Sequence, residues 1–495
     1  MIRKLKKYLL LLAVFSIFGV GMALSGCGMA EKEARNHYVM SLAFDEEAMT
    51  LTGQQTVCYV NLSENAFDSL YFHLYPNAFA SGRERSVVAS NKMDEAYYDG
   101  LSSGWIDILS VCFENDNKAQ YEISGEQENI LVVNLQETLY PDEEVAINID
   151  FSVKLANINH RLGNGENTIN FGNFYPIACV YEEGVGFSQN PYHANGDPFY
   201  SDCSDYDVTI KYADRFSIAT SGNVTKERAD EENRCVAIEA ENVRDFCFVL
   251  SEKFEKASVI QEGVTINYYG YKGDTDLEEN VNVAAQAVQT FVELFGEYPY
   301  KQISIVKASF LNGGMEYPNL VLISDKVAAA DYIYVIVHEI AHQWWYSVVG
   351  NDQYNHAWLD EGLAEYSTLL FFKQHTEYGE DFNQMIISAE NSYKLFVKIY
   401  TKVNGSVDGV MDKPLCQFET EPEYVQCTYT KGVLLLDSIR QTIGDKKFHR
   451  ALTKYYNEFA FKNATPADFI SVFISVSGTD MEGYINSWLY DKIVW

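Results

Sequence analysis

The segment from Asp331 to Tyr366, DYIYVIVHEIAHQWWYSVVGNDQYNHAWLDEGLAEY, constrains this chain more than any other stretch. His338 and His342 are four positions apart, so on an α-helix both imidazoles project from one face and can hold one metal ion. Glu339 lies between them, where its carboxylate points beside the metal and suits a base acting on water. The flanking residues are mostly apolar, which is typical of a buried helix.

A third ligand has to come from elsewhere in the segment. After His342 there is room for the first helix to end near Gly350, followed by a turn and a second helix-like run that carries Glu361 back toward the histidines. Two histidines and one carboxylate leave the fourth position of a tetrahedral zinc site open, and an open position distinguishes catalytic from structural zinc. The sequence therefore predicts a hydrolytic site with one zinc ion held by His338, His342 and Glu361.

Four motifs in this chain resemble those of a known enzyme family. HEIAHQWW followed by WLDEGLAEY resembles the gluzincin zinc metallopeptidases of the aminopeptidase N and leukotriene-hydrolase family. Gly313-Gly314-Met315-Glu316 resembles the GxMEN motif of that family, whose glutamate binds the free α-amino group of the substrate. Tyr429-Thr430-Lys431-Gly432 resembles its YxKG motif, whose tyrosine hydrogen-bonds the oxyanion. One position departs from the pattern, because Tyr317 stands where the first motif ends in Asn.

The resemblance implies a zinc-dependent aminopeptidase that acts on peptides with a free N-terminus. Glu339 would be the base, Tyr429 the oxyanion donor, and Gly313, Gly314, Met315 and Glu316 would bind the substrate. Two alternatives stay open. If Glu316 is an ordinary solvated loop acid, the enzyme is a zinc endopeptidase. A surface lipoprotein could also keep this fold only to bind peptides, although a pure binder has no need of the ligands, the base and the tyrosine together.

The first part of the chain has the pattern of a β domain. From about residue 37 to about residue 256 one strand-like run follows another, and Val145 to Leu155 alternates apolar and polar residues with the period of a half-buried strand. Turn signals such as Asn195-Gly196-Asp197-Pro198 separate the runs. We expect an antiparallel β-sandwich domain over residues 28–255, which the resemblance also implies.

The second part begins with a helical pattern from Val281 to Gly296, followed by a strand from Gln302 to Val306. Leu320 to Ile323 is expected to be an edge strand that lines the cleft. The rest is mainly helical, including a helix that begins near Tyr429 and another over Phe448 to Phe459. The predicted fold class is α+β and multidomain: a β-sandwich, then a thermolysin-like catalytic domain over residues 256–495 that is first mixed α/β and then mainly helical.

The N-terminus has the features of a targeting segment. A basic start is followed by an apolar run from Tyr8 to Met22, which is shorter than a typical membrane span. Leu24-Ser25-Gly26-Cys27 resembles the lipobox of bacterial lipoproteins, in which the cysteine is lipidated after cleavage. We expect residues 1–27 to be a signal peptide with a lipobox, and the protein to be anchored through Cys27 to the outer face of the bacterial cell membrane. An ordinary cleaved signal or an uncleaved anchor are the alternatives.

Composition narrows the class of partner. The 495 residues are 47% hydrophobic, which is enough for two or three cores, and the formal net charge is −33. Such an acidic chain is unsuited to nucleic acid, whereas cationic peptides are compatible with it. Nine cysteines include no CxxC pair, which argues against a cysteine-type zinc site. Disulfides are permitted, but the sequence does not pair them.

Two acids are candidates for supporting roles. Glu365 is four residues beyond Glu361 and could orient a zinc-bound histidine, because metal ligands need an outer partner. The alternative is a plain solvated acid. A second group that binds the substrate amine is expected from the β domain, and Glu166 is one guess for it. Among the aromatic residues, Tyr424 could line the site or could simply pack.

Overall fold

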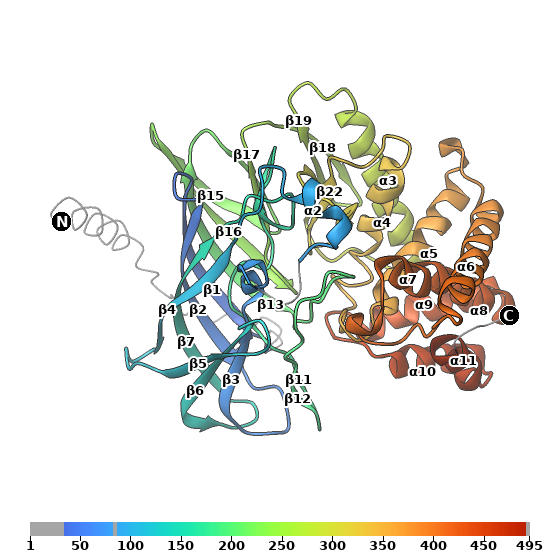
Figure 1. Ribbon diagram of the computed structural model, residues 1–495, viewed down its shortest axis with the longest axis horizontal. Coiled ribbons are helices and arrows are strands. Elements are labelled where there is room, and N and C mark those ends of the chain that lie inside the picture. The colour runs from blue at the N-terminus through green and yellow to red at the C-terminus, as the bar shows by residue number, and fades with distance from the viewer. Residues whose placement is uncertain (1–33, 83–86, 492–495) are drawn as a thin grey trace. The chain divides into compact units, whose positions relative to one another are not determined.

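The computed structural model describes residues 34–82 and 87–491 (Figure 1). Arg35–Trp495 forms one compact unit. The predicted signal segment and its lipobox at Cys27 lie outside the described residues. Within the described ranges, no helix is both long enough and apolar enough to cross a bilayer.

The first part of this unit is built on a seven-stranded sheet. In spatial order its strands are β15 (Asn223–Ala229), β16 (Asn233–Val243), β13 (Ser204–Ala213), β1 (His37–Asp45), β2 (Thr50–Val60), β7 (Glu144–Lys154) and β4 (Trp105–Phe113). The pairing of β1 with β13 is parallel, whereas the other pairings are antiparallel, so the wholly antiparallel sheet that was predicted is wrong at this one place. The two strands are far apart in sequence, and no hairpin sets their relative direction.

Alternation along the strands decides which side of this sheet is buried. In β7, Ile147, Ile149, Phe151 and Val153 are fully buried and alternate with half-exposed residues, as the sequence predicts. They share a core with two four-stranded sheets. The first is β10 (Ile177–Ala178), β3 (Phe67–His73), β6 (Ile130–Leu139) and β5 (Gln120–Ser124); the second is β14 (Ser217–Thr220), β17 (Phe248–Ser251), β9 (Ile169–Phe171) and β8 (Leu162–Asn164).

A separate five-stranded sheet opens the second part of the unit. Its order is β18 (Phe254–Gln261), β19 (Val264–Tyr271), β20 (Gln302–Ala308), β22 (Leu320–Ser324) and β21 (Gly314–Met315). The change of sheet falls between β17 and β18, close to the boundary expected near residue 255. The edge next to the cleft is the two-residue strand β21, not β22 as predicted, because β22 pairs on both sides and is buried along its whole length.

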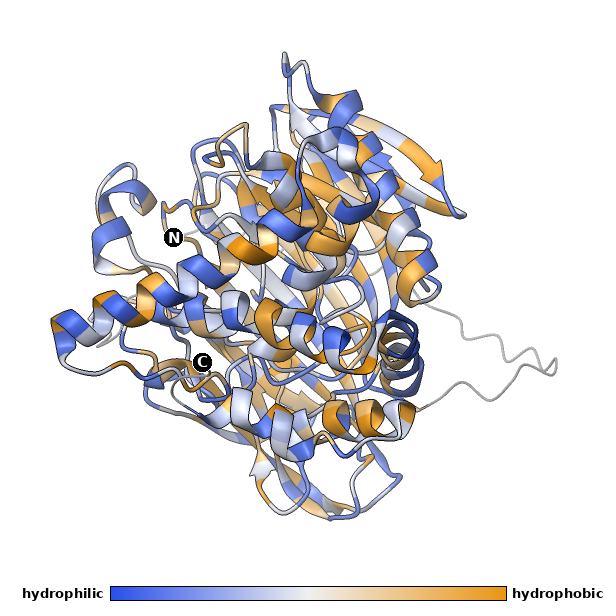
Figure 2. Cartoon of the chain, turned by 90° about the vertical axis from the view of Figure 1, so that its right-hand side faces the viewer, coloured by the Kyte–Doolittle hydropathy of each residue, from blue (hydrophilic) through white to orange (hydrophobic). Residues whose placement is uncertain are grey.

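Helices make up the rest of the second part and share one hydrophobic core with the five-stranded sheet. They are α3 (Leu277–Phe295), α4 (Tyr332–Ala341), α5 (Trp358–Gln374), α6 (Phe382–Asn404), α7 (Glu421–Val425), α8 (Lys431–Ile443), α9 (Asp445–Phe459), α10 (Pro466–Ser477) and α11 (Glu482–Tyr490). Figure 2 shows hydrophilic and hydrophobic residues alternating along them, as expected of helices that bury one face. All eight cysteines within the described ranges are free thiols.

The helix that carries the two histidines is shorter than predicted. α4 ends at Ala341, and His342 is its C-cap residue, whereas the sequence suggested an end near Gly350. His342 keeps helical dihedral angles, with φ −62° and ψ −15°, so the four-residue spacing still places both imidazoles on one face. The backbone then turns back on itself, with Ser347 N–H donating to the carbonyl of His342. This compact turn brings α5 against α4.

Candidate active site

Three side chains from two helices converge on one point. His338 and His342 come from the end of α4, and Glu361 comes from the first turn of α5. The two Nε2 atoms are 3.1 Å apart, and Glu361 Oε2 lies 3.4 Å from that of His338 and 3.2 Å from that of His342. Ligands bound at about 2.0–2.1 Å to a tetrahedral zinc would be about 3.3 Å from one another, so the spacing fits one zinc ion.

The outer nitrogen of each imidazole lies against an oxygen atom, which leaves the inner nitrogen Nε2 as the atom that can bind a metal. His338 Nδ1 lies 2.9 Å from Glu365 Oε2, the contact predicted from the sequence, and His342 Nδ1 donates to the carbonyl of Trp345 over 3.0 Å. Both Nε2 atoms therefore present lone pairs to each other and to the Glu361 carboxylate. Three acceptors that face one another without a donor fit a cation.

The electrostatics of the cluster agree with that reading. Burial opposes ionisation of Glu361, yet the two imidazoles that face its carboxylate outweigh burial and lower its pKa to about 2. Glu339 faces the same space and is buried as well, and burial raises its pKa to about 7. Its carboxylate lies against Gly314, where any side chain would collide with it. This contact explains why glycine stands at that position of the loop.

Glu316 lies at the other end of the same cavity. It follows β21 directly, is 2% exposed, and lines the cavity together with Gly313 and Gly314. Met315 does not line it, contrary to the prediction, because successive residues of a strand point to opposite faces. Burial, followed by the nearby Asp197 carboxylate, raises the pKa of Glu316 well above its usual range.

Tyr429 lies in a π-helical turn, Gln426–Thr430, immediately before α8. Its hydroxyl donates to Glu361 Oε1, and burial raises the pKa of the phenol well above 10, so the phenol keeps its proton. Tyr424 also lines the cavity and packs edge-on against Tyr429, with ring centroids 5.8 Å apart. α5 and α8 cross next to this pair of rings, where the Cα atoms of Gly362 and Gly432 face each other.

The β part contributes a buried ion pair that the sequence did not reveal. Asp197 and Arg161 form the pair and line the cavity, and Arg161 Nη1 also lies 3.0 Å from the sulfur of Met315. The guess of Glu166 as the acid from the β domain is wrong, because Glu166 is 2.8 Å from Lys326 Nζ and does not line the cavity. The turn that carries Asp197 was recognised in the sequence only as a strand boundary.

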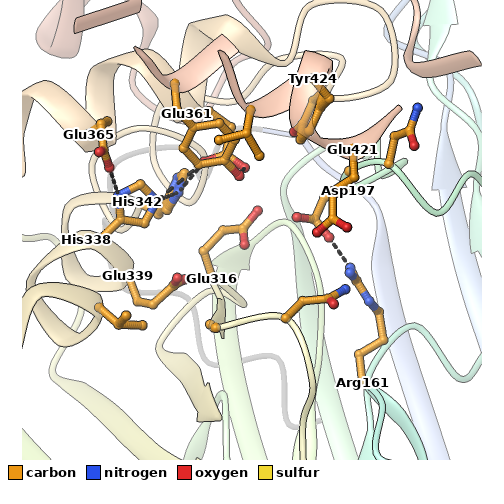
Figure 3. Close-up of a pocket in the computed structure, with 18 of the residues that line it drawn as sticks. Arg161, Asp197, Glu316, His338, Glu339, His342, Glu361, Glu365, Glu421 and Tyr424 are labelled. Carbon is orange, nitrogen blue, oxygen red and sulfur yellow. Dashed lines mark hydrogen bonds and ion pairs between the residues drawn. The ribbon is translucent and has the colours of Figure 1, made fainter. Parts of the chain in front are cut away.

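The cavity has a volume of about 270 Å³ and is lined from both parts of the unit. Figure 3 shows the histidines, Glu339 and Glu361 on one side of it, and Asp197 and Glu421 on the other, with Glu316 between them. Glu421 is paired with Lys92 over 2.7 Å. The one departure from the family pattern points away from this space. Tyr317 is fully buried, and its hydroxyl donates to Asn173 Oδ1 over 2.6 Å.

Comparison with known proteins agrees with this geometry. Residues 279–488 match the Peptidase family M1 domain. This part of the chain is therefore similar to M1 peptidases. The matched range includes the three zinc-ligand candidates, Glu339 and Tyr429. It also includes Glu316, whose loop lies at the edge of the five-stranded sheet.

Relatives of the M1 domain include curated enzymes and solved structures. Leucine aminopeptidase 2-1 of Meyerozyma guilliermondii is 27% identical over 48% of this chain, and aminopeptidase B of Mus musculus is 26% identical over 40%. The matches cover only 38% and 31% of those two proteins. The crystal structure of an M1 zinc metallopeptidase from Deinococcus radiodurans superposes with a TM-score of 0.66 at 17% identity, covering 93% of this chain and 94% of that one. This likeness confirms the predicted fold class.

Proposed function

We propose that this protein is a zinc-dependent aminopeptidase that removes the first residue from peptides with a free N-terminus. The observation that carries the proposal is the placement of Glu316 in the same cavity as His338, His342, Glu361 and Glu339. The M1 domain match, the aminopeptidases among the relatives and the zinc metallopeptidase structures support it. A variant of the Deinococcus radiodurans enzyme was also solved with the peptide Tyr-Ser-Ala bound.

His338, His342 and Glu361 would hold the single zinc ion. When bound, zinc supplies Lewis acidity, which makes water a stronger nucleophile and polarises the scissile carbonyl. The contacts of the two Nδ1 atoms with the Glu365 carboxylate and the Trp345 carbonyl favour the imidazole tautomer that a metal requires.

The other side chains move or stabilise charge. Glu339 accepts the proton of the attacking water and delivers it to the leaving amine, which converts a poor leaving group into a neutral one. Tyr429, protonated at neutral pH, donates a hydrogen bond to the oxyanion, a contact typically worth about 3 kcal/mol. Its hydroxyl donates to Glu361 Oε1, which places it next to the candidate zinc ligands.

Glu316 and Asp197 distinguish this site from that of an endopeptidase. Both carboxylates face one space, and Arg161 pairs with Asp197 (Figure 3). A substrate α-ammonium between them would form charge-assisted hydrogen bonds, which fixes the scissile bond one residue from the end. An N-acetylated peptide lacks this positive charge.

Hydrolysis of alanine 4-nitroanilide, with and without an N-acetyl group, tests the proposal. Zinc-loaded protein should cleave the free amine at least 100-fold faster in kcat/KM, and a chelator should abolish the activity. Glu339→Gln should lose turnover while it retains one zinc ion, which metal analysis would measure. Equal rates on both substrates would favour the endopeptidase, and activity that survives in Glu339→Gln would refute the assigned base.

The protein is further proposed to be an exported lipoprotein attached to the outer face of the bacterial cell membrane through Cys27. The support is the sequence alone: the basic start, the short apolar run and the lipobox-like tetrapeptide. Several acyl chains would anchor the protein stably, since a single chain binds only marginally. Metabolic labelling with palmitate should mark the wild type and leave Cys27→Ser unlabelled. Label that persists in the variant would exclude this anchor.

A further inference from the structure

The carboxylate of Glu316 accepts a hydrogen bond from a side chain that does not line the cavity. Gln353 Nε2 donates to Glu316 Oε1 over 2.5 Å and to Asp360 Oδ2 over 2.6 Å. All three side chains are buried, and Asp360 accepts a further hydrogen bond from Asn351. The two N–H groups of one amide are therefore shared between two carboxylates. The opposite orientation of the amide would place its oxygen against both of them.

The backbone of the Glu316 loop is held by a second glutamine. Gln343, which follows His342, donates Nε2–H to the carbonyl of Tyr317 over 3.2 Å and accepts from Asn319 N–H over 2.8 Å. Gln343 thus fixes the main chain after Glu316, while Gln353 fixes its side chain. Both glutamines belong to the segment that connects α4 with α5. The same segment that joins the two helices of the candidate metal ligands therefore also holds the Glu316 loop.

Gln353 itself has little freedom to move. Its backbone N–H donates to the carbonyl of Phe199 in the β part, and its side chain is 1% exposed. Its Oε1 is buried without a hydrogen-bond partner, so the amide is oriented only through its two N–H groups. Because Oε1 of Glu316 is held in this way, Oε2 is the oxygen left to meet a ligand in the cavity.

We infer that Gln353 is a positioning residue for recognition of the α-ammonium group, acting through Glu316. The inference rests on the proposed aminopeptidase function. Without the amide, the buried Glu316 and Asp360 side chains both lose the donor that holds them in place. Glu316 would turn away from the geometry that an ammonium ion requires, while the zinc ligands and Glu339, which do not contact Gln353, would keep theirs.

A pair of hydroxamates that differ only in the amine tests this. Alanine hydroxamate and propionohydroxamate both bind zinc through the hydroxamate group, but only the first carries an α-ammonium. Titration calorimetry on zinc-loaded protein gives Kd for each, and their ratio isolates amine recognition from zinc binding without a measurement of activity. The variant is Gln353→Met, which keeps the volume and removes both donors. Gln353→Asn, which withdraws the amide by one methylene, is the second variant if the first does not fold.

A matched control comes from the β part. Gln55 is equally buried and donates to the carbonyl of Pro176 over 3.0 Å, so Gln55→Met makes the same chemical change far from the cavity. In the wild type and in Gln55→Met, the amine should strengthen binding at least ten-fold, as a hydrogen bond to a charged group does. In Gln353→Met that preference should fall at least ten-fold, with Kd for propionohydroxamate and the zinc content unchanged.

The two dissociation constants distinguish a positioning role of Gln353 from a merely structural one. An unchanged ratio in folded, zinc-loaded Gln353→Met would overturn the inference. So would an equal loss of affinity for both hydroxamates, because it would mark Gln353 as merely structural. If the wild type itself binds the two compounds equally, the aminopeptidase proposal fails, which is distinguishable from failure of the role of Gln353.

Discussion

The crossing of α5 and α8 gives a sharp prediction for Gly432→Ala. A methyl group at Gly432 would lie 2.7 Å from the Cα of Gly362, whereas ordinary contacts begin at 3.4 Å. The obstacle is backbone and cannot rotate away, so the two helices have to separate by at least about 0.7 Å. Glu361 immediately precedes Gly362, and Tyr429 lies three residues before Gly432, so this separation acts on the contact between the proposed zinc ligand and the proposed oxyanion donor.

The magnitude follows from two opposing effects. Overpacking a buried contact costs about 1–3 kcal/mol, whereas alanine in place of glycine within a helix recovers about 0.5–1 kcal/mol. The net loss of unfolding free energy should therefore be about 0–2.5 kcal/mol, which is modest. The effect on catalysis should be larger, because a displacement near 1 Å at the reacting groups can cost about 100-fold in rate.

Two comparisons make the assay specific. Gly362→Ala places its methyl 3.2 Å from the Cα of Gly432, so it should be the milder of the two variants. Gly483→Ala in α11 meets nothing within 4 Å and should be neutral or slightly stabilising. Urea unfolding gives the stabilities, and kcat on alanine 4-nitroanilide gives the activities. If Gly432→Ala keeps wild-type kcat, or if Gly362→Ala is the more damaging, the reasoning from the helix crossing is wrong.

Three further predictions concern the site and the β part. Tyr429→Phe should lower kcat by about 100- to 1,000-fold while retaining one zinc ion by metal analysis, and loss of the zinc would contradict its role as an oxyanion donor. His342→Ala should abolish zinc binding and lower Tm to that of the chelator-treated wild type, since a bound ligand stabilises only the native state; a variant that still holds one zinc ion would exclude His342 as a ligand. Burial raises the pKa of Asp245 to about 7, so the folded chain keeps this proton over a range where the unfolded chain, with a pKa near 3.9, has lost it. Stability should therefore fall as pH rises from about 4 to about 7, by up to roughly 4 kcal/mol, and Asp245→Asn should remove that part of the slope in urea unfolding at several pH values; an unchanged slope would contradict it.

Local patterns in the sequence predicted much of the fold. The alternation in β7 and the helical spacing of α3 are properties of short windows, and burial in the structure follows them. Which of β21 and β22 forms the edge of the sheet was not predictable in this way, because both are short and only pairing decides it. The parallel pairing of β1 with β13 also joins segments far apart in the chain, and no local signal sets its direction.

The site shows the same division. His338, Glu339 and His342 share one turn of helix, so their relation is fixed by helical geometry. Asp197 reaches the cavity only because the β part packs against the catalytic part, and its sequence context marks a turn. The role of Gln353 was not predicted, because no sequence pattern around it indicates that its amide contacts Glu316.

By itself, then, the sequence determined the chemistry: a pair of histidines at helical spacing, a base between them, and a tyrosine and a glutamate in recognisable motifs. Only the tertiary structure decided how those groups face one another. It also decided that the acid of the β part that lines the cavity is Asp197 and not Glu166, and that the amide of Gln353 holds Glu316. The physical reason is the distance along the chain over which each effect acts. Helical and strand periodicity act over a few residues, whereas a cavity is formed by side chains that packing brings together from distant parts of the chain.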